Sequence, residues 1–314
     1  MFDRRKFLKS TTLSAFTPLI FGRPTLRKDH SPAEESPLSR RLKSVTRTSP
    51  WTLVHQVKVQ FKTFHCQGMV KIGRDFWVSS VEIPTPENGV FDRTKGKGHL
   101  FKIDETGKLL ADVAIGEGSI YHPSGIDFDG EHIWIAAAEY RPDSKAIIYR
   151  FNPASLQLQE QFRWDDHIGG IARNRSTNTL HGISWGSRRS YKWELDEKDA
   201  IRKPLPAPAG LARLNHSFYI DYQDNQYLGG QEMLYTGLVA YKGPGGNKFA
   251  LGGVEIVDLE KGLAVHQVPV QCWSPVTGAV MTQNPSFFEL AEGDKIRAHF
   301  MPDDNESTIF VYEV

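Results

Sequence analysis

Four histidines lead similar segments of this 314-residue chain. His65, His122, His167 and His216 follow one another at intervals of 57, 45 and 49 residues, and Asn284 leads a fifth segment 68 residues later. Each is followed by a short apolar run, a polar turn and a second apolar run. Equivalent positions of a repeat occupy equivalent places in a repeat fold. We therefore expect these five side chains to lie at one end of a shared structure.

Three of these segments also carry a carboxylate at nearly constant spacing. Glu82, Glu139 and Glu232 lie 17, 17 and 16 residues after the leading histidine of their segments. Where imidazoles and carboxylates converge, a protein can hold a divalent transition metal, and neutral imidazole suits Zn, Fe or Mn better than Ca²⁺. The four histidines are the predicted metal ligands, with the metal's identity left open. The three glutamates are the predicted catalytic groups, available for proton transfer or for orienting the imidazoles.

A purely structural interpretation of the histidines stays open. His122 and Asn284 are each followed by Pro-Ser, and side chains in such turns often bond backbone between neighbouring repeats. Against this, His65 and His216 lack the following proline, and His167 precedes Ile-Gly-Gly. The turn sequence thus differs between segments while the histidine is kept. A role confined to the turn would not require the same histidine in different turns.

Basic and aromatic residues cluster in the connections that follow the second apolar run of each segment. These connections are expected on the same face as the histidines, so a basic rim there would suit an anionic substrate such as a uronate. The alternative is that these are ordinary charged surface loops. The predicted substrate-binding residues are Arg93, Arg141, Arg188, Arg189, Tyr140 and Tyr235.

The spacing of the segments predicts the fold that would position these groups. Segments of 45 to 68 residues match the four strands of a propeller blade. The third and fourth strands of most blades are readable, although in the third blade the fourth strand is weak and is expected near residues 200–205. The fifth blade has only three strands before the chain ends, so residues 51–61 are expected to supply the fourth. The sequence therefore predicts an all-β fold, a single five-bladed β-propeller over residues 50–314 with almost no helix.

The segment "HPSGIDFDGEHIWIA", residues 122–136, resembles the repeats of the gluconolactonase and strictosidine-synthase type of propeller. Residues 51–314 as a whole resemble a family of exported bacterial propellers of unassigned function. The resemblance implies a propeller fold and leaves the activity to be argued from the site.

The N-terminus is predicted to be an export signal. "DRRKFLKS" contains Arg4-Arg5 and then Phe7-Leu8-Lys9, as in twin-arginine signals, and a modest apolar stretch follows. We assign residues 1–22 to the signal and residues 23–49, rich in Pro, Ser and charge, to a flexible linker. The alternative is a basic amphipathic helix. The expected location is periplasmic or secreted, with the twin-arginine export machinery as a partner and no membrane association after signal removal.

Charge and cysteine content exclude some classes of function. The first 49 residues hold 11 Lys/Arg and 4 Asp/Glu, which leaves 27 basic and 33 acidic residues in the rest, a net charge of −6. An acidic folded part argues against a nucleic-acid partner. Cys66 and Cys272 could pair in an oxidising compartment or remain isolated buried thiols.

These observations lead to one hypothesis and two alternatives for the function. The hypothesis is a metal-dependent lyase or hydrolase acting on a small anionic or sugar-derived substrate at the top of the central channel. One alternative is a non-catalytic propeller that binds a glycan or a partner. The other is a lactonase-like hydrolase in which histidines do not hold a metal.

Overall fold

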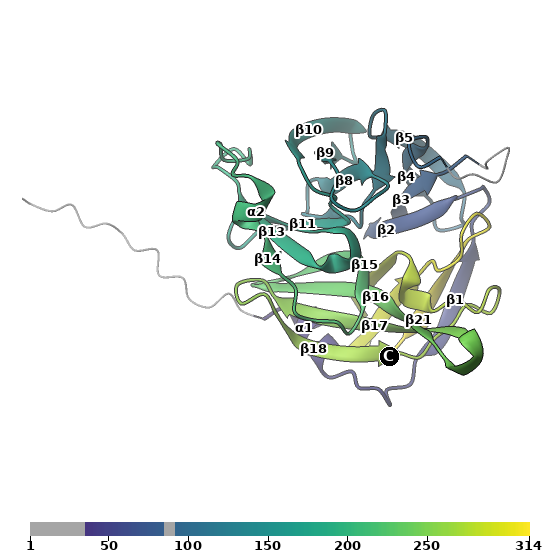
Figure 1. Cartoon of the computed structure of the whole chain (residues 1–314). Helices are drawn as coiled ribbons and strands as arrows, with labels where there is room; N and C mark the ends of the chain where they lie inside the picture. Colours follow the sequence, from purple (N-terminus) through teal and green to yellow (C-terminus); the bar gives the residue numbers. More distant parts are fainter. Residues whose placement is uncertain (1–34, 85–91) are drawn as a thin grey trace, which may run out of the picture. The chain divides into compact units, whose positions relative to one another are not determined.

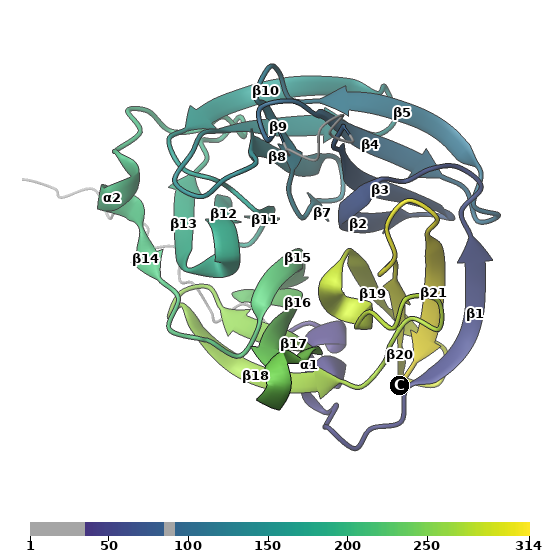
Figure 2. The ribbon, with the colours of Figure 1, turned by 45° about the vertical axis from the view of Figure 1, so that its right-hand side comes forward.

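The repeated segments fold into antiparallel sheets of four main strands, and five such sheets surround one axis (Figures 1 and 2). The structure, a computed structural model, describes residues 35–84 and 92–314, which belong to one compact unit. Figure 2 shows the innermost strands around the centre, with the other strands of each sheet stacked outward. The prediction of a five-bladed β-propeller is confirmed.

The first three blades follow one another along the chain, each running from the axis outward. The first blade contains β2 (His65–Ile72), β3 (Asp75–Glu82), β4 (Lys97–Ile103) and β5 (Leu109–Ile115). The second contains β6 (Ile120–Pro123), β7 (Asp127–Phe128), β8 (Ile133–Glu139), β9 (Ala146–Asn152) and β10 (Gln157–Trp164), and its inner strand is split into β6 and β7, which both pair with β8. The third contains β11 (Gly170–Asn174), β12 (Thr179–Ile183), β13 (Arg189–Glu194) and β14 (Arg213–Leu214).

The fifth blade closes the ring as the sequence predicts. Its outer strand is β1, which pairs antiparallel with β21, so the N-terminal strand covers an edge that would otherwise be open. The strands of the last two blades are β15 (Asp221–Gly229), β16 (Glu232–Lys242), β17 (Lys248–Asp258) and β18 (Leu263–Val270); β19 (Ser286–Ala291), β20 (Lys295–Phe300), β21 (Thr308–Glu313) and β1 (Thr52–Lys58).

The fourth strand of the third blade differs from its predicted position. Residues 200–205 make only an isolated bridge, Leu195 with Ile201, and the strand that pairs with β13 is the two-residue β14. The chain between them bulges outward and contains α2 (Pro208–Leu211). Two prolines, at 204 and 206, cannot donate to a ladder, which explains why the outer edge of this blade is mostly unpaired.

Helical structure is sparse, but one helix lies where a flexible linker is predicted. α1 (Pro37–Lys43) begins at Ser36, whose side chain accepts a hydrogen bond from the Ser39 backbone N–H. Leu42 and Val45 are each only 1% exposed and pack in one core cluster with residues of the fourth and fifth blades. The remaining helical pieces are single turns, η1 (Trp185–Ser187), η2 (Pro244–Gly246) and η3 (Met281–Gln283).

Polar side chains tie the blades together at the axis. The Asp224 carboxylate on β15 accepts hydrogen bonds of 3.0 Å from the backbone N–H groups of Met69 in the first blade and Ser286 in the fifth. The neighbouring Asn225 donates to the Ile171 carbonyl oxygen in the third blade at 3.0 Å. Burial raises the pKa of Asp224 well above its usual value. These bonds join four of the five inner strands, since β15 belongs to the fourth blade.

Glycines let the inner strands of the second and third blades touch. Gly125 and Gly170 form a parallel bridge, and the Gly125 N–H donates to the Gly169 carbonyl oxygen at 2.9 Å. A Cβ on Gly170 would lie 2.3 Å from the Asn225 side-chain oxygen, so a larger residue does not fit. The bridge fixes the segments just before it, which carry His122 and His167.

Cys66 and Cys272 are both free and buried, so they do not form a disulfide with each other. The predicted export signal and the first part of the predicted linker lie outside the described residues. Within the described part of the chain, no helix is both long enough and apolar enough to cross a membrane.

Candidate functional site

The site is built where the second and third blades meet at one end of the axis. His122 lies on β6 and is 6% exposed, and His167 lies just before β11 and is also buried. Their ring centroids are 5.6 Å apart. The Gly125–Gly170 bridge lies a few residues further along both inner strands, which explains why these two histidines meet.

Hydrogen bonding fixes the protonation of His167. Its Nδ1 lies 2.9 Å from the backbone carbonyl oxygen of Glu139, at the end of β8. A carbonyl oxygen can only accept, so Nδ1 carries the proton and Nε2 presents a lone pair. Burial lowers the pKa of His167 to about 4, which keeps the ring neutral at neutral pH. The ring is therefore a fixed, neutral acceptor with its basic nitrogen defined.

His122 is also held neutral, but by a different environment. Its ring stacks on Tyr140, with centroids 4.5 Å apart and planes 12° from parallel. Burial lowers its pKa well below the usual value, and the nearby His167 and His65 rings lower it further. Its Nδ1 is buried and has no hydrogen-bond partner among the described residues. A buried nitrogen without a partner is costly, so a bound ligand there would restore a lost interaction.

Aromatic rings enclose the histidine pair. Trp185, in η1, packs its ring edge-on against His167 with centroids 4.8 Å apart and lies 5.6 Å from Tyr140. The Arg93 guanidinium lies 5.2 Å from the centre of the Tyr140 ring. The Tyr121 hydroxyl donates to the Arg93 backbone carbonyl oxygen at 2.8 Å and so fixes that loop. The set combines apolar ring faces with a cation, which suits a ligand having both apolar and anionic parts.

The buried carboxylate of Asp166 fixes the backbone of the segment that carries His167. Asp166 accepts hydrogen bonds from the Arg189 guanidinium, at 3.1 Å for both Nε and a terminal nitrogen, and from the Tyr191 hydroxyl at 2.6 Å. It also accepts from the His167 backbone N–H at 2.8 Å. Arg189 continues to Asp143 at 2.5 Å. The Arg189 guanidinium is thus paired with two carboxylates and holds the loop that carries His167.

The other two predicted metal ligands lie in different surroundings. His65 is half-buried at the start of β2, and its Nδ1 lies 2.9 Å from the Asp304 carboxylate, which also accepts from Asn284. His216 is exposed in the segment between β14 and β15. Within residues 35–84 and 92–314, no three His, Cys, Asp or Glu side chains form a group that could hold a metal ion. The structure thus brings two of the four histidines into contact, with His65 near them.

The three predicted catalytic glutamates do not share one place. The Glu139 carboxylate, beside the pair, accepts from Ser119 at 3.0 Å and from Arg141 at 2.5 Å. Glu82 ends β3 and lies 3.7 Å from both Lys97 and His99.

The predicted alignment of the fourth blade, which made Glu232 equivalent to Glu139, is wrong. Glu232 begins β16 and binds Ser39 and Lys43 of the α1 segment, whereas Glu139 ends β8. The two lie at opposite ends of equivalent strands. The polar run at Asp224 and Asn225 suggests a turn, but it lies inside the inner strand β15, so the true hairpin comes later.

The predicted substrate-binding residues also divide between two places. Tyr140, Arg93, Arg141 and Arg189 surround the histidine pair or its support. Tyr235 is buried in the fourth blade and stacks on Tyr222 with centroids 4.1 Å apart. Arg188 donates to the Ser217 carbonyl oxygen at 2.8 Å and thereby holds the segment before β15.

Sequence reasoning missed the role of two residues. Trp185 stands in the third blade at the place that Tyr140 takes in the second, because Ser184 and Glu139 are the equivalent residues before them, and this equivalence was the available signal. Asp304 orients His65 from a loop between β20 and β21, and no repeat spacing pointed to it.

The chain belongs to a family of unknown function (DUF6454), whose model matches residues 35–314. A comparison with curated protein sequences found no match. Among solved structures, a hypothetical protein from Leishmania major is similar with a TM-score of 0.50 and 10% identity, over 82% of this chain and 89% of that one. A periplasmic gluconolactonase from Pseudomonas aeruginosa has a TM-score of 0.37 and 11% identity, over 79% and 85%. At these identities the likeness concerns the fold alone.

Proposed function

We propose that the chain is a hydrolase that cleaves a small, anionic, sugar-derived ester or lactone at the histidine pair, with His167 as the general base. The observation that carries the proposal is the hydrogen bond between His167 Nδ1 and the Glu139 carbonyl oxygen, because it leaves Nε2 as a buried, oriented base. Neutral buried imidazole with a defined tautomer is the form that general-base catalysis requires.

The proposed reaction needs only a water molecule besides the substrate. His167 Nε2 takes a proton from water as the water oxygen bonds to the substrate's carbonyl carbon. The carbon–oxygen ester bond then breaks, and the imidazolium returns the proton to the leaving alkoxide oxygen. Tyr140 and Trp185 would contact the apolar face of a sugar ring, and Arg93 would attract its carboxylate.

A metal-assisted version is the second candidate, and the distance between the two rings favours it. Two imidazoles bound to one ion have centroids roughly 5–6 Å apart, given metal–nitrogen distances of about 2.0–2.1 Å. His122 and His167 are 5.6 Å apart, and the bond from Nδ1 to Glu139 would orient His167 as a ligand. Such an ion, Zn, Fe or Mn, would have two imidazole ligands and would activate the same water.

Turnover by matched variants tests the proposal. The full chain is assayed with six-carbon aldonolactones and uronate esters, without added metal and with Zn²⁺ or Mn²⁺. We expect His167→Gln to lower kcat by at least 100-fold, while His132→Gln, in the β7–β8 hairpin away from the pair, leaves it unchanged. Binding of these compounds without turnover would favour a non-catalytic glycan-binding propeller and contradict the enzyme proposal. Turnover that requires added Zn²⁺ or Mn²⁺ in the wild type, together with loss of bound metal in both His122→Ala and His167→Ala, would select the metal-assisted version.

Export to the periplasm or beyond is a separate proposal that rests on Arg4-Arg5. Twin-arginine signals are read by a receptor that requires the arginine pair. Replacing both residues with lysine should leave the protein in the cytoplasm of a bacterial host. Unchanged export of that variant would contradict the assignment.

A further inference from the structure

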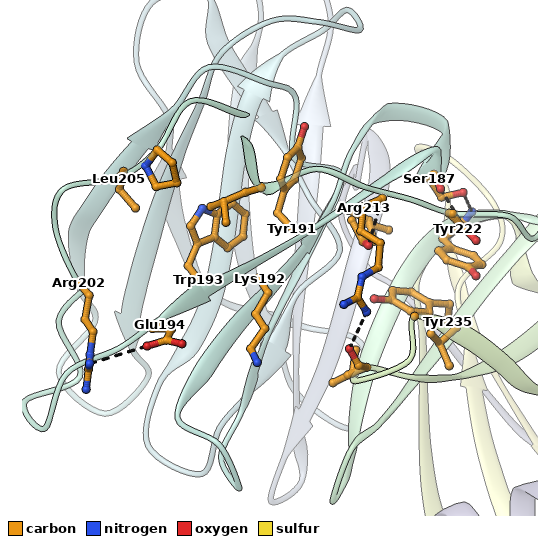
Figure 3. A pocket seen from close by; sticks show the side chains of 18 residues that line it. Ser187, Tyr191, Lys192, Trp193, Glu194, Arg202, Leu205, Arg213, Tyr222 and Tyr235 are labelled. Atoms are coloured by element: carbon orange, nitrogen blue, oxygen red, sulfur yellow. Dashed lines mark hydrogen bonds and ion pairs between the residues drawn. The ribbon is translucent and has the colours of Figure 1, made fainter. Parts of the chain in front are cut away.

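A cavity of about 490 Å³ lies between the third and fourth blades, away from the histidine pair (Figure 3). It exists because the outer edge of the third blade is incomplete: β14 pairs with only Arg189 and Ser190 of β13, and the chain between β13 and β14 bulges outward. β13, this bulge and the facing side of the fourth blade line the space. We call it the interblade cavity. Its size is in the range of sites that bind small molecules.

Apolar and aromatic side chains form most of the cavity's wall. Leu205 and Leu211 of the bulge line the cavity, and the stacked Tyr222 and Tyr235 contribute from the fourth blade. Figure 3 shows Leu205 and the two tyrosines on opposite sides of Trp193 of β13. Such a wall favours a ligand with an apolar body, since burying it removes apolar surface from water.

One polar atom in this wall has no partner. Trp193 is 2% exposed, and its indole nitrogen is buried without a hydrogen bond among the described residues. Figure 3 shows that nitrogen on the side of Leu205, which lines the cavity. An indole N–H can only donate, so leaving it unpaired costs free energy that a ligand acceptor would recover.

Positive charge gathers at the same cavity. Within the described residues Lys192 makes no ion pair, and Arg213 donates only to backbone carbonyl oxygens, those of Leu259 at 3.5 Å and Glu260 at 2.8 Å. A third cation, Arg202, is compensated by Glu194 at 3.8 Å (Figure 3). Burial lowers the pKa of the nearby His181, and the charges of Lys192 and Arg213 lower it further. Two cations without carboxylate partners beside an apolar wall are a recognition pattern for an anion.

We propose that the interblade cavity binds an amphipathic carboxylate, a molecule with an acyl chain or aromatic body and one anionic head group. The body lies against Trp193 and the stacked tyrosines, and the carboxylate lies toward Lys192 and Arg213. This site is separate from the histidine pair and does not depend on the proposed hydrolase activity.

Isothermal titration of the full chain with three probes tests the proposal. Octanoate carries both features, octanol only the apolar body, and acetate only the charge. We expect octanoate to bind at least 5-fold more tightly than octanol and at least 100-fold more tightly than acetate. Equal affinity for octanoate and octanol, or no heat with octanoate up to millimolar concentration, would overturn the proposal.

Variants place the binding in this cavity. Lys192→Gln with Arg213→Gln should weaken octanoate at least 10-fold and leave octanol unchanged, whereas Lys198→Gln, in the turn after β13 and outside the cavity, should change neither. Leu205→Trp fills the cavity without touching a charge and should abolish binding of both. Its result decides the question if the double charge variant does not fold. Octanoate affinity that is unaltered in Leu205→Trp would show that the ligand binds elsewhere.

Discussion

His167 Nδ1 lies 2.9 Å from the backbone carbonyl oxygen of Glu139, and this bond joins the third blade to the end of the second. It fixes which ring nitrogen carries the proton, while burial keeps the ring neutral. The His167 ring is thereby held by a backbone carbonyl group. The position of that group is set by the sheet, not by a flexible side chain.

The tautomer and pKa of His167 can be measured without a substrate. We expect nitrogen-15 NMR of the full chain to show the Nδ1–H tautomer for His167 and a pKa of about 4, because burial disfavours the imidazolium. His55, exposed on β1, provides an internal reference in the same spectra. An Nε2–H tautomer, or a His167 pKa near 6.5, would contradict the geometry described.

Buried histidines should make the fold sensitive to mild acid. The pKa values of His167 and His181 are lowered to about 4 and about 3, so between those values and about 6.5 the unfolded chain binds more protons. The free energy of unfolding should therefore fall as the pH is lowered, by about 2 kcal/mol per such histidine between pH 7 and pH 5.

The contribution of His181 can be isolated by substitution. His181→Asn can keep a hydrogen bond to Thr179 but cannot be protonated, so its loss of stability from pH 7 to pH 5 should be smaller by about 2 kcal/mol. Urea unfolding at the two pH values measures this, with His55→Asn as the control. An equal pH dependence in wild type and His181→Asn would show that the ring is not buried neutral.

The two carboxylates that bind Arg189 should differ in their importance. Asp166 is buried and accepts from Arg189, Tyr191 and the His167 backbone, whereas the Asp143 side chain is 74% exposed. Asp166→Asn should lower the free energy of unfolding by about 2–4 kcal/mol, because it removes the buried carboxylate of the Arg189 ion pairs and leaves only the exposed Asp143.

Asp143→Asn is the matched control and should cost less than about 1 kcal/mol, since water screens its ion pair. Asp143 has a φ of 48°, a conformation that asparagine tolerates, so the backbone is not strained by the change. Chemical denaturation measures both variants. Similar losses in the two would mean that Asp166 is not the anchor of this loop.

The segment before β1 should contribute to stability. Leu42 packs in the core with residues of the fourth and fifth blades, so Leu42→Ala should cost about 2–5 kcal/mol. Arg40, largely exposed on the same helix, provides the control, and Arg40→Ala should change stability by no more than about 0.5 kcal/mol. A Leu42→Ala variant as stable as Arg40→Ala would indicate that α1 is not docked in solution.

The sequence by itself determined the number of blades, the closing role of residues 51–61, which contain β1, and the equivalence of His122 and His167. These follow from alternating strands and regularly spaced turns, whose hydrophobic pattern is local and repeats along the chain. The same reasoning placed the strands of the first, second and fifth blades close to where they lie.

Only the tertiary structure decided which groups share the site. The polar Asp224 and Asn225 suggest a turn, yet they lie inside β15, because their side chains bond backbone of three other blades and are satisfied there. Because the hairpin therefore follows Gly229 instead of Asn225, Glu232 begins β16 and lies at the opposite end of its blade from the predicted position. α1 likewise forms in a polar, proline-containing stretch because Leu42 finds a core built from residues about 190 or more positions away. Burial and hydrogen bonding between distant segments carry no local period, and so the sequence pattern could not reveal them.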